Sequence, residues 1–230
     1  MPDNNDEADF SAIIASSVHD MKNSLCMLLG ALDEIMERYE SEEDSTFEGF
    51  SHVRYEGNRV NNSLIQLLSL YRIGNGQYAL NLSENDVEEC IEECFLESEG
   101  LLALKGIESN MSCDGDLLWY FDRNLIIGML NSVINNSYKY TKNIINLNVF
   151  VEDDYLVIAV EDNGDGYPEA MLHEDQEHVP GIDYKSGSTG LGLYFAGQIA
   201  HMHENKGRRG FIKTNNDGIN GGGKFAIYLP

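Results

Sequence analysis

Two long stretches near the start of the chain repeat their apolar residues at the spacing of one face of an α-helix. The first runs from Ser11 to about Tyr39, and the second from about Phe50 to Ile73. In both, apolar residues recur three, four and seven positions apart, which is typical of a helix with one buried face. A short acidic segment, residues 39–49, joins them, so the pattern predicts an antiparallel helical hairpin.

A single hairpin buries little apolar surface, because each helix offers its apolar stripe to only one neighbour. The stripes consist of Val18, Leu25, Leu29, Leu32 and Met36 in the first helix and of Val53, Val60, Leu64, Leu67, Leu68 and Tyr71 in the second. We expect two chains to complete the packing as a homodimeric four-helix bundle. The sequence GNGQ, Gly74 to Gln77, then ends the second helix, which places the hairpin domain at residues 1–76.

Residues 77–230 mix the helical period with the alternation of strands. The patterns predict helices at 86–95 and 123–141, a strand at 116–122, two strands within 145–162, and a last strand within 221–230. Helices laid against a mixed or antiparallel sheet form an α/β sandwich, so we expect the fold class α+β. The second domain would then occupy residues 77–230.

The charge balance limits the possible partners. Fifteen basic and 39 acidic residues give a net charge of −24, which would repel both nucleic-acid phosphates and anionic lipid. No apolar run approaches the roughly 20 residues that span a bilayer, and the first ten residues are acidic, unlike a signal peptide. We therefore expect a cytoplasmic protein that binds neither nucleic acid nor a membrane surface.

The cysteines show no metal-binding pattern. No CxxC pair occurs among Cys26, Cys90, Cys94 and Cys113, and no histidine stands near Cys90 and Cys94 to complete a zinc site. Reduced thiols are therefore favoured over a metal site.

His19 lies on the more polar face of the first predicted helix, together with Lys22, Asn23 and Cys26. Taken alone, this position favours a solvated histidine, since most single histidines do no chemistry. A chemical role for His19 needs support from the rest of the chain.

The second domain contains two glycine clusters. VEDNGDGYP places Asp162, Gly164 and Gly166 directly after a predicted strand, and GSTGLGLYFAGQIA places Gly190 and Gly192 where a helix opens. Glycines at a helix start let a ligand approach the backbone, whose unpaired N–H groups attract phosphate. Glycine turns beside strands are also common, so each cluster alone is a weak signal.

An asparagine-rich helix lies between the hairpin and these clusters. NSVINNSYKYT contains Asn131, Asn135, Asn136 and Lys139, whose amide oxygens could hold Mg²⁺ and whose lysine could meet phosphate. The alternative is that they are ordinary surface polar groups. The order of asparagine helix, acidic glycine turn and glycine-rich helix start favours a nucleotide site.

Four motifs stand in the order of a known family: His19–Asn23, Asn136–Thr141, Asp162–Gly166 and Thr189–Leu193. They resemble the phosphoacceptor box, the asparagine box and the two glycine boxes of two-component sensor histidine kinases. The resemblance extends from about Ser11 to Pro230, and four motifs in one order are far more specific than any one.

The resemblance implies that the second domain binds ATP. By similarity, Asp162 accepts a hydrogen bond from the adenine amino group, and Asn136 ligates a Mg²⁺ that bridges the phosphates. Lys139 and Tyr140 would contact phosphate or ribose. The remaining implied nucleotide-binding positions are Gly164, Gly166, Thr189, Gly190, Leu191 and Gly192.

The resemblance also implies the chemistry at the hairpin. His19 would attack the γ-phosphate, Asp20 would accept a proton from the other ring nitrogen, and the phosphate would pass to an aspartate on a response-regulator receiver domain. Asn23, one helical turn from His19, matches the position that orients a water for dephosphorylating that partner.

Some residues depart from the family pattern. Ser24 stands where proline is frequent, Ser132 where the asparagine box has its first asparagine, and Ser188 where glycine is usual. Residues 167–188 replace a phenylalanine-bearing segment and are predicted to form an atypical ATP lid. A metal site at His173 and His178 in that segment is conceivable, but a solvated acidic loop is favoured.

Two alternatives to a kinase remain. A histidine phosphotransfer adaptor or scaffold would use the hairpin histidine with little or no ATP, and an ATPase of the chaperone or mismatch-repair type would lack the hairpin. Only residues 1–10 precede the first predicted helix. We therefore expect either a fragment of a longer kinase or a chain that receives its signal from a separate sensor protein in trans. Whether ATP reaches the histidine of the same subunit or of its partner stays open.

Overall fold

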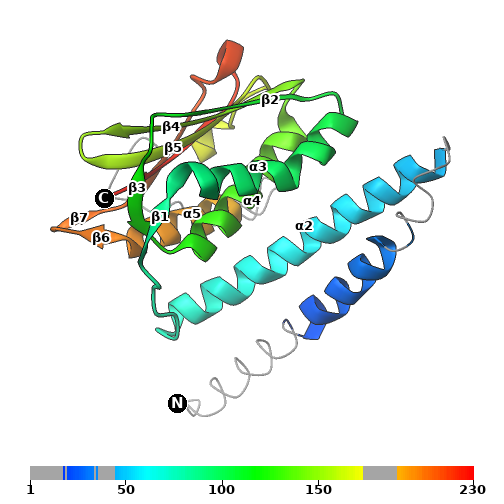
Figure 1. Ribbon diagram of the computed structural model, residues 1–230, viewed down its shortest axis with the longest axis horizontal. Helices are drawn as coiled ribbons and strands as arrows, with labels where there is room; N and C mark the ends of the chain where they lie inside the picture. The colour runs from blue at the N-terminus through cyan, green and yellow to red at the C-terminus, as the bar shows by residue number, and fades with distance from the viewer. Residues whose placement is uncertain (1–17, 19, 34, 36–44, 173–190) are drawn as a thin grey trace. The chain divides into compact units, whose positions relative to one another are not determined.

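The computed structural model describes residues 18, 20–33, 35, 45–172 and 191–230, and Figure 1 shows the chain as a ribbon. The chain divides into two compact units, Met1–Ala79 and Leu80–Pro230, which we name the hairpin unit and the sandwich unit.

The hairpin unit contains two antiparallel helical segments. Residues 18, 20–33 and 35 are helical, and α2 runs from Ser45 to Gly74. Leu29 packs so closely on Gly57 that a Cβ there would lie 2.6 Å from Leu29 Cδ2. Nearer the end of the first segment, Arg54 pairs with Asp33 at 3.5 Å. As the residue number rises along the first segment, the residue number of its partner on α2 falls. The two segments are therefore antiparallel, which confirms the predicted helical hairpin.

The helix α2 begins about five residues before the predicted start. Its first turn, STFEG, is mostly polar and gives no periodic apolar signal. In the first segment, three predicted stripe residues, Val18, Leu29 and Leu32, are buried within the single chain.

The sandwich unit has a mixed five-stranded sheet in the order β2-β4-β5-β9-β8, in which only β2 and β4 are parallel. Two-stranded sheets pair β1 with β3 and β6 with β7. The elements in chain order are β1 (Ser83–Asp86), α3 (Val87–Leu104), β2 (Glu108–Cys113), β3 (Leu118–Phe121), α4 (Arg123–Tyr140), β4 (Ile144–Glu152), β5 (Tyr155–Asp162), η1 (Glu169–Met171), α5 (Leu191–Met202), β6 (Glu204–Asn205), β7 (Arg208–Arg209), β8 (Phe211–Asn215), η2 (Ile219–Gly221) and β9 (Lys224–Leu229).

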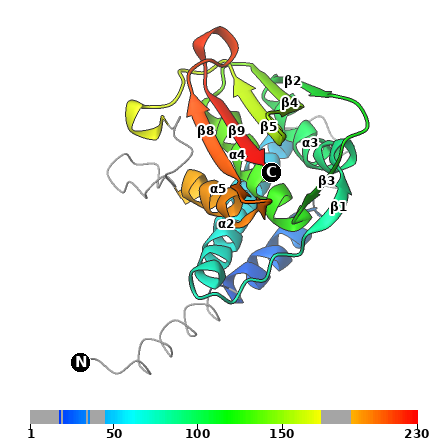
Figure 2. The same cartoon turned by 90° about the vertical axis from the view of Figure 1, so that its left-hand side faces the viewer.

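The helices α3, α4 and α5 lie together on one face of the sheet, as Figure 2 shows. Alternate strand residues such as Leu147, Ile158 and Ile227 are fully buried. The opposite face of the sheet carries a second apolar cluster, in which aromatic side chains cover Val157 and Ala159. This arrangement confirms the predicted α/β sandwich.

The connection between β4 and β5 is a two-residue hairpin, which lies within the range predicted to hold two strands. Asp153 and Asp154 have φ values of 49° and 63°. A left-handed conformation at both loop residues matches the right-handed twist of the flanking strands, and aspartate tolerates that conformation better than most residues.

A buried histidine ties the start of α4 to the end of α5. Asp122 caps α4 by accepting the N–H of Leu125 at 3.2 Å, while its own N–H donates to His203 Nε2 at 3.1 Å. The other ring nitrogen, Nδ1, lies 2.8 Å from Ile199 O, so the ring is neutral with its proton on Nδ1. Burial lowers the pKa of His203, with Ile199 and Asp122 acting in the opposite direction.

Candidate functional site

Asp162, the last residue of β5, is only 6% exposed, and backbone N–H groups hold its carboxylate. Asp162 Oδ1 accepts hydrogen bonds from Gly164 N at 2.8 Å and from Gly223 N at 3.3 Å. Oδ2 lies 3.2 Å from the place where a Cβ of Gly223 would be. Among the described residues Oδ2 accepts no hydrogen bond, so it can accept one from a ligand.

The turn after Asp162 has no room for side chains. A Cβ at Gly164 would lie 2.3 Å from the carbonyl oxygen of Tyr140 and 2.9 Å from Asp162 Oδ1. A Cβ at Gly222 would lie 2.1 Å from the carbonyl oxygen of Asp162. The end of β5, the end of α4 and the loop before β9 therefore meet backbone to backbone, and Gly164 has a packing role of its own.

Asn216 fixes the next part of the glycine turn. Gly166 has φ +77°, a conformation that favours glycine. Asn216 Oδ1 accepts the N–H of Tyr167 at 2.6 Å, and its Nδ2 donates to the carbonyl of the same residue at 3.1 Å. Thr214 Oγ1 donates to Met171 O at 2.6 Å. Residues 166–172 are thereby tied to β8 and the loop after it.

Tyr167 lies next to Asp162. Its Cε2 is 3.1 Å from the Cβ position of Gly223, the same point that Asp162 Oδ2 approaches. Burial raises the pKa of the Tyr167 phenol, and the Asp162 carboxylate raises it further. The hydroxyl therefore stays protonated beside the carboxylate.

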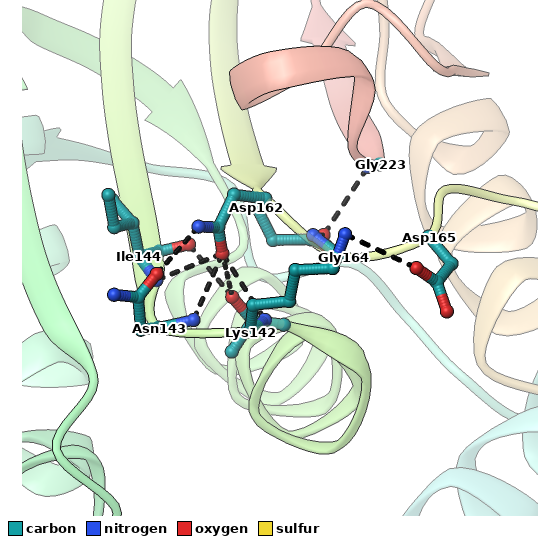
Figure 3. A network of polar contacts seen from close by, with 9 residues as sticks. Lys142, Asn143, Ile144, Asp162, Gly164, Asp165 and Gly223 are labelled. Carbon is teal, nitrogen blue, oxygen red and sulfur yellow. Dashed lines mark hydrogen bonds and ion pairs between the residues drawn. The ribbon is translucent and has the colours of Figure 1, made fainter.

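Asn163 organises the connection between α4 and β4. Figure 3 labels Lys142, Asn143 and Ile144 of this connection. Its Oδ1 is approached by the backbone N–H groups of Lys142 (3.2 Å), Asn143 (3.0 Å) and Ile144 (3.1 Å) and by Thr141 Oγ1 (2.9 Å). Its Nδ2 donates to Asn143 Oδ1 at 2.7 Å. One buried amide oxygen thus lies within hydrogen-bonding distance of three consecutive backbone N–H groups.

Sequence reasoning gave no role to several of these residues, namely Asn163, Tyr167, Asn216, Gly222 and Gly223. The run of three glycines before β9 is a visible signal of close approach. The roles of the asparagines depend on neighbours far away in the sequence, which no local pattern reveals.

The asparagine helix and the second glycine cluster meet in space. A Cβ at Gly192, in the first turn of α5, would lie 3.3 Å from both Asn136 Nδ2 and Ser132 Oγ. Asn136 is exposed, and Leu191 begins α5. Thr189 and Gly190 lie outside the described residues, as do His173, His178 and Ser188.

The last turn of α4 presents a lysine and a tyrosine to solvent. Lys139 Nζ lies 4.9 Å from the ring centroid of Tyr140, and both side chains are exposed. Lys142, just beyond α4, pairs with Asp165 at 3.4 Å. These lysines place positive charge near the glycine turn of a chain whose net charge is −24.

The donor set fits Mg²⁺ only together with phosphate. Within the part of the chain that the structure describes, no group of three or more His, Cys, Asp or Glu side chains could hold a metal. Mg²⁺ commonly takes one or two protein oxygens and completes its octahedron with phosphates and water. An amide oxygen such as that of Asn136 suits this role.

The residues expected to do the phosphate chemistry belong to the hairpin unit. His19 lies outside the described residues, whereas Asp20 and Asn23 are exposed on the first helical segment.

The cysteines carry reduced thiols rather than disulfides. Burial raises the pKa of Cys90 to about 11, so this thiol stays protonated at neutral pH.

The sandwich unit matches a known protein family. Residues 121–230 match the family described as histidine kinase-, DNA gyrase B- and HSP90-like ATPase. The matched region begins at the end of β3 and includes α4, the glycine turn after Asp162 and α5.

Curated relatives are similar to the chain over most of its length. Sporulation kinase D of Bacillus subtilis is 26% identical over 193 residues, which cover 83% of this chain and 37% of the relative. The signal transduction histidine-protein kinase AfsQ2 of Streptomyces coelicolor is 26% identical over 239 residues, covering 94% of this chain and 41% of the relative. The chain thus spans about two fifths of the length of these relatives.

Solved structures share the fold. Acinetobacter baumannii histidine kinase AdeS superposes with a TM-score of 0.57 at 19% identity, covering 92% of this chain and 96% of that one. Full-length ShkA, solved in complex with AMPPNP, gives a TM-score of 0.63 at 17% identity, covering 95% of this chain and 45% of that one.

The sandwich unit is therefore similar, over residues 121–230, to the histidine kinase-, DNA gyrase B- and HSP90-like ATPases. Together with the similarity of the whole chain to curated histidine kinases, this match supports a two-component histidine kinase catalytic core. None of the helices in the described residues is long and apolar enough to cross a membrane.

Proposed function

We propose that the chain binds ATP with Mg²⁺ in the sandwich unit and transfers the γ-phosphate to His19. The observation that supports this most directly is the arrangement of the Asp162 carboxylate, which lies in the region that matches an ATPase family. Two backbone N–H groups hold one of its oxygens, and the other accepts no hydrogen bond from the described residues. That oxygen can accept a hydrogen bond from the amino group of adenine but not from the carbonyl that guanine has at the same place, so Asp162 would select ATP over GTP.

The phosphates would lie toward Asn136 and the start of α5. Asn136 and Gly192 are neighbours, and a helix start offers unpaired N–H groups to an anion. Bound Mg²⁺ would offset phosphate charge, with Asn136 as its ligand. Lys139 and Tyr140 would contact phosphate or ribose from the exposed last turn of α4. The turn at Gly190 and Gly192 would hold the phosphate tail. The other proposed nucleotide-binding positions are Gly164, Gly166, Thr189 and Leu191.

The proposed phosphoryl transfer is an in-line displacement. One ring nitrogen of neutral His19 attacks the γ-phosphorus, the new N–P bond forms as the P–O bond to ADP breaks, and ADP leaves. Asp20 accepts the proton of the other ring nitrogen, so the phosphorylated ring does not keep a positive charge.

The phosphate would then pass to a response-regulator receiver domain. An aspartate oxygen of that partner forms a P–O bond as the N–P bond breaks, and the His19 ring recovers its proton. Asn23 would orient the water that later removes the phosphate from the partner. The input would come from a sensor domain or a separate sensor protein.

The hairpin unit would form a homodimer. Three stripe residues of α2, Val53, Val60 and Leu67, stay 50%, 47% and 43% exposed in the single chain. They are seven positions apart and therefore lie on one face, as in a helix that packs against further helices. A four-helix bundle of two hairpins would cover them.

Calorimetric titration with Mg-ATP tests the nucleotide site. In Asp162→Asn the side-chain oxygen can keep the bonds to Gly164 and Gly223, which leaves the NH₂ facing the adenine amino group. We expect ATP affinity to fall by at least about tenfold, because a hydrogen bond to a charged group is lost. The control is Asp165→Asn in the same motif, whose side chain is 96% exposed and should change little. Equal affinity in folded Asp162→Asn and the parent would refute the assignment.

A further inference from the structure

Asn163 stands between the two parts of the proposed nucleotide site. Asp162, which is proposed to read the base, directly precedes Asn163 in the sequence. Residues 141–144, which contact Asn163 in space, follow the last turn of α4 with Lys139 and Tyr140. The side chain of Asn163 joins the two.

The contacts of Asn163 are concentrated on one atom. Four donors of residues 141–144 lie within 3.2 Å of Oδ1, which has two lone pairs, so the donors share them. Asn163 N also donates to Ile144 O at 3.3 Å. Thr141 Oγ1 lies 2.9 Å from both Asn163 Oδ1 and Ile144 O and can donate to either. Asn163 is 9% exposed, so little water can replace these bonds.

The carboxylate of Asp162 is held independently of this network. Its partners are the N–H groups of Gly164 and Gly223, and neither belongs to residues 141–144. Loss of the Asn163 side chain would therefore loosen the end of α4 while leaving both bonds to Asp162 Oδ1 in place.

We propose that Asn163 is a positioning residue that fixes the last turn of α4 at the distance from Asp162 that a nucleotide with both a base and phosphates requires. The inference rests on the proposed function. Adenosine would contact only the base-reading part of the site at Asp162, whereas ATP would also contact the phosphate-binding part at the end of α4. Asn163 should therefore support the additional affinity that ATP gains over adenosine through its phosphates.

The test is titration of the full chain with Mg-ATP and, separately, with adenosine. In Asn163→Ala we expect ATP affinity to fall about tenfold, as several hydrogen bonds are lost, with adenosine affinity changed less than about twofold. A merely structural role would lower the folded fraction and weaken both ligands by the same factor. Asn143→Ala is the matched control, because it removes only the acceptor of the Asn163 Nδ2 bond and leaves all donors to Oδ1.

A second variant keeps the test decisive if Asn163→Ala does not fold. Thr141→Val keeps the shape of the side chain and removes one donor, so the ratio of ATP to adenosine affinity should fall by a smaller factor. The inference is overturned if the ratio of ATP to adenosine affinity does not change in folded Asn163→Ala, whether both affinities stay the same or both fall by the same factor. If Asn163→Ala is unfolded, the same result in Thr141→Val overturns it. A parent chain that binds neither ligand would instead refute the proposed function on which it rests.

Discussion

Replacing Gly164 by alanine should destabilise the sandwich unit, because backbone already occupies the place of the new methyl group. The ideal Cβ lies 2.3 Å from Tyr140 O and 2.9 Å from Asp162 Oδ1. Real Cβ atoms essentially never come within 3.0 Å of such neighbours, so the end of α4 or the carboxylate has to move. Either movement disturbs groups proposed to bind nucleotide.

The size of the effect follows from two opposing contributions. Overpacking a rigid site costs about 1–3 kcal/mol, while the change from glycine to alanine recovers about 0.5 kcal/mol by restricting the unfolded chain. We expect the free energy of unfolding to fall by about 1.5 kcal/mol, which lowers the Tm of a unit of this size by about 3–6 °C.

Trp119 in β3 provides the assay, since it is the one tryptophan of the chain and belongs to the sandwich unit. Urea unfolding followed by its fluorescence should show a lower midpoint for Gly164→Ala. The matched control is Gly128→Ala in α4, where a Cβ would meet nothing within 4 Å. That change should raise stability by about 0.5–1 kcal/mol, because glycine disfavours the helix interior. Equal midpoints for Gly164→Ala and the parent would refute the reasoning.

Three further predictions concern the pH dependence of stability, the roles of Asn23 and Asp20 in the phosphate chemistry, and assembly of the dimer. The pKa of His203 is lower in the folded chain than in the unfolded one, so its contribution to stability is complete above its unfolded pKa of about 6.5 and is lost as pH falls through its folded pKa. The urea midpoint should therefore fall more below pH 6.5 in the parent than in His203→Gln, which can still accept from Asp122 but does not titrate; equal slopes would contradict this. Asn23→Ala should keep much of the autophosphorylation yet slow dephosphorylation of the receiver domain, whereas Asp20→Asn should cut autophosphorylation by about 10²-fold, as measured in time courses of both phosphoproteins; equal loss of both activities in Asn23→Ala would mean that the amide only supports the helix. Light scattering should find the full chain dimeric and residues 81–230 monomeric, and a monomeric full chain at micromolar concentration would rule out the bundle.

The helices and central strands could be predicted because their signals are local. The sequence predicts α4 at residues 123–141, and the helix spans Arg123–Tyr140 because apolar residues follow the helical period directly after a capping aspartate. The strands β4 and β5 alternate clearly on either side of a two-aspartate turn.

The strand β2 could not be predicted, because its sequence ESNMSC is polar and it lies at the edge of the sheet. It becomes a strand by pairing with β4, which is a property of the folded unit rather than of the segment. Tertiary context of this kind commonly overrides local strand propensity.

The residues of the candidate site also divide into those that the sequence predicts and those that only the folded chain reveals. The motifs indicate Asp162 and Asn136 because their residue types suit a base and a metal. Gly164 could be predicted as a position of close approach, but the atom it approaches, Tyr140 O, becomes apparent only once α4 ends against the glycine turn. Asn163 and Asn216 bond to backbone remote in sequence, so their roles need the folded chain.

The most direct test of the central claim is whether His19 carries phosphate. Incubation of the purified chain with ATP labelled at the γ-phosphate should give protein-bound label that is labile in acid and stable in base, as expected for phosphohistidine. His19→Ala should carry no label, whereas His52→Ala, on the other helix of the hairpin, should keep it. Label that persists on folded His19→Ala would contradict the account.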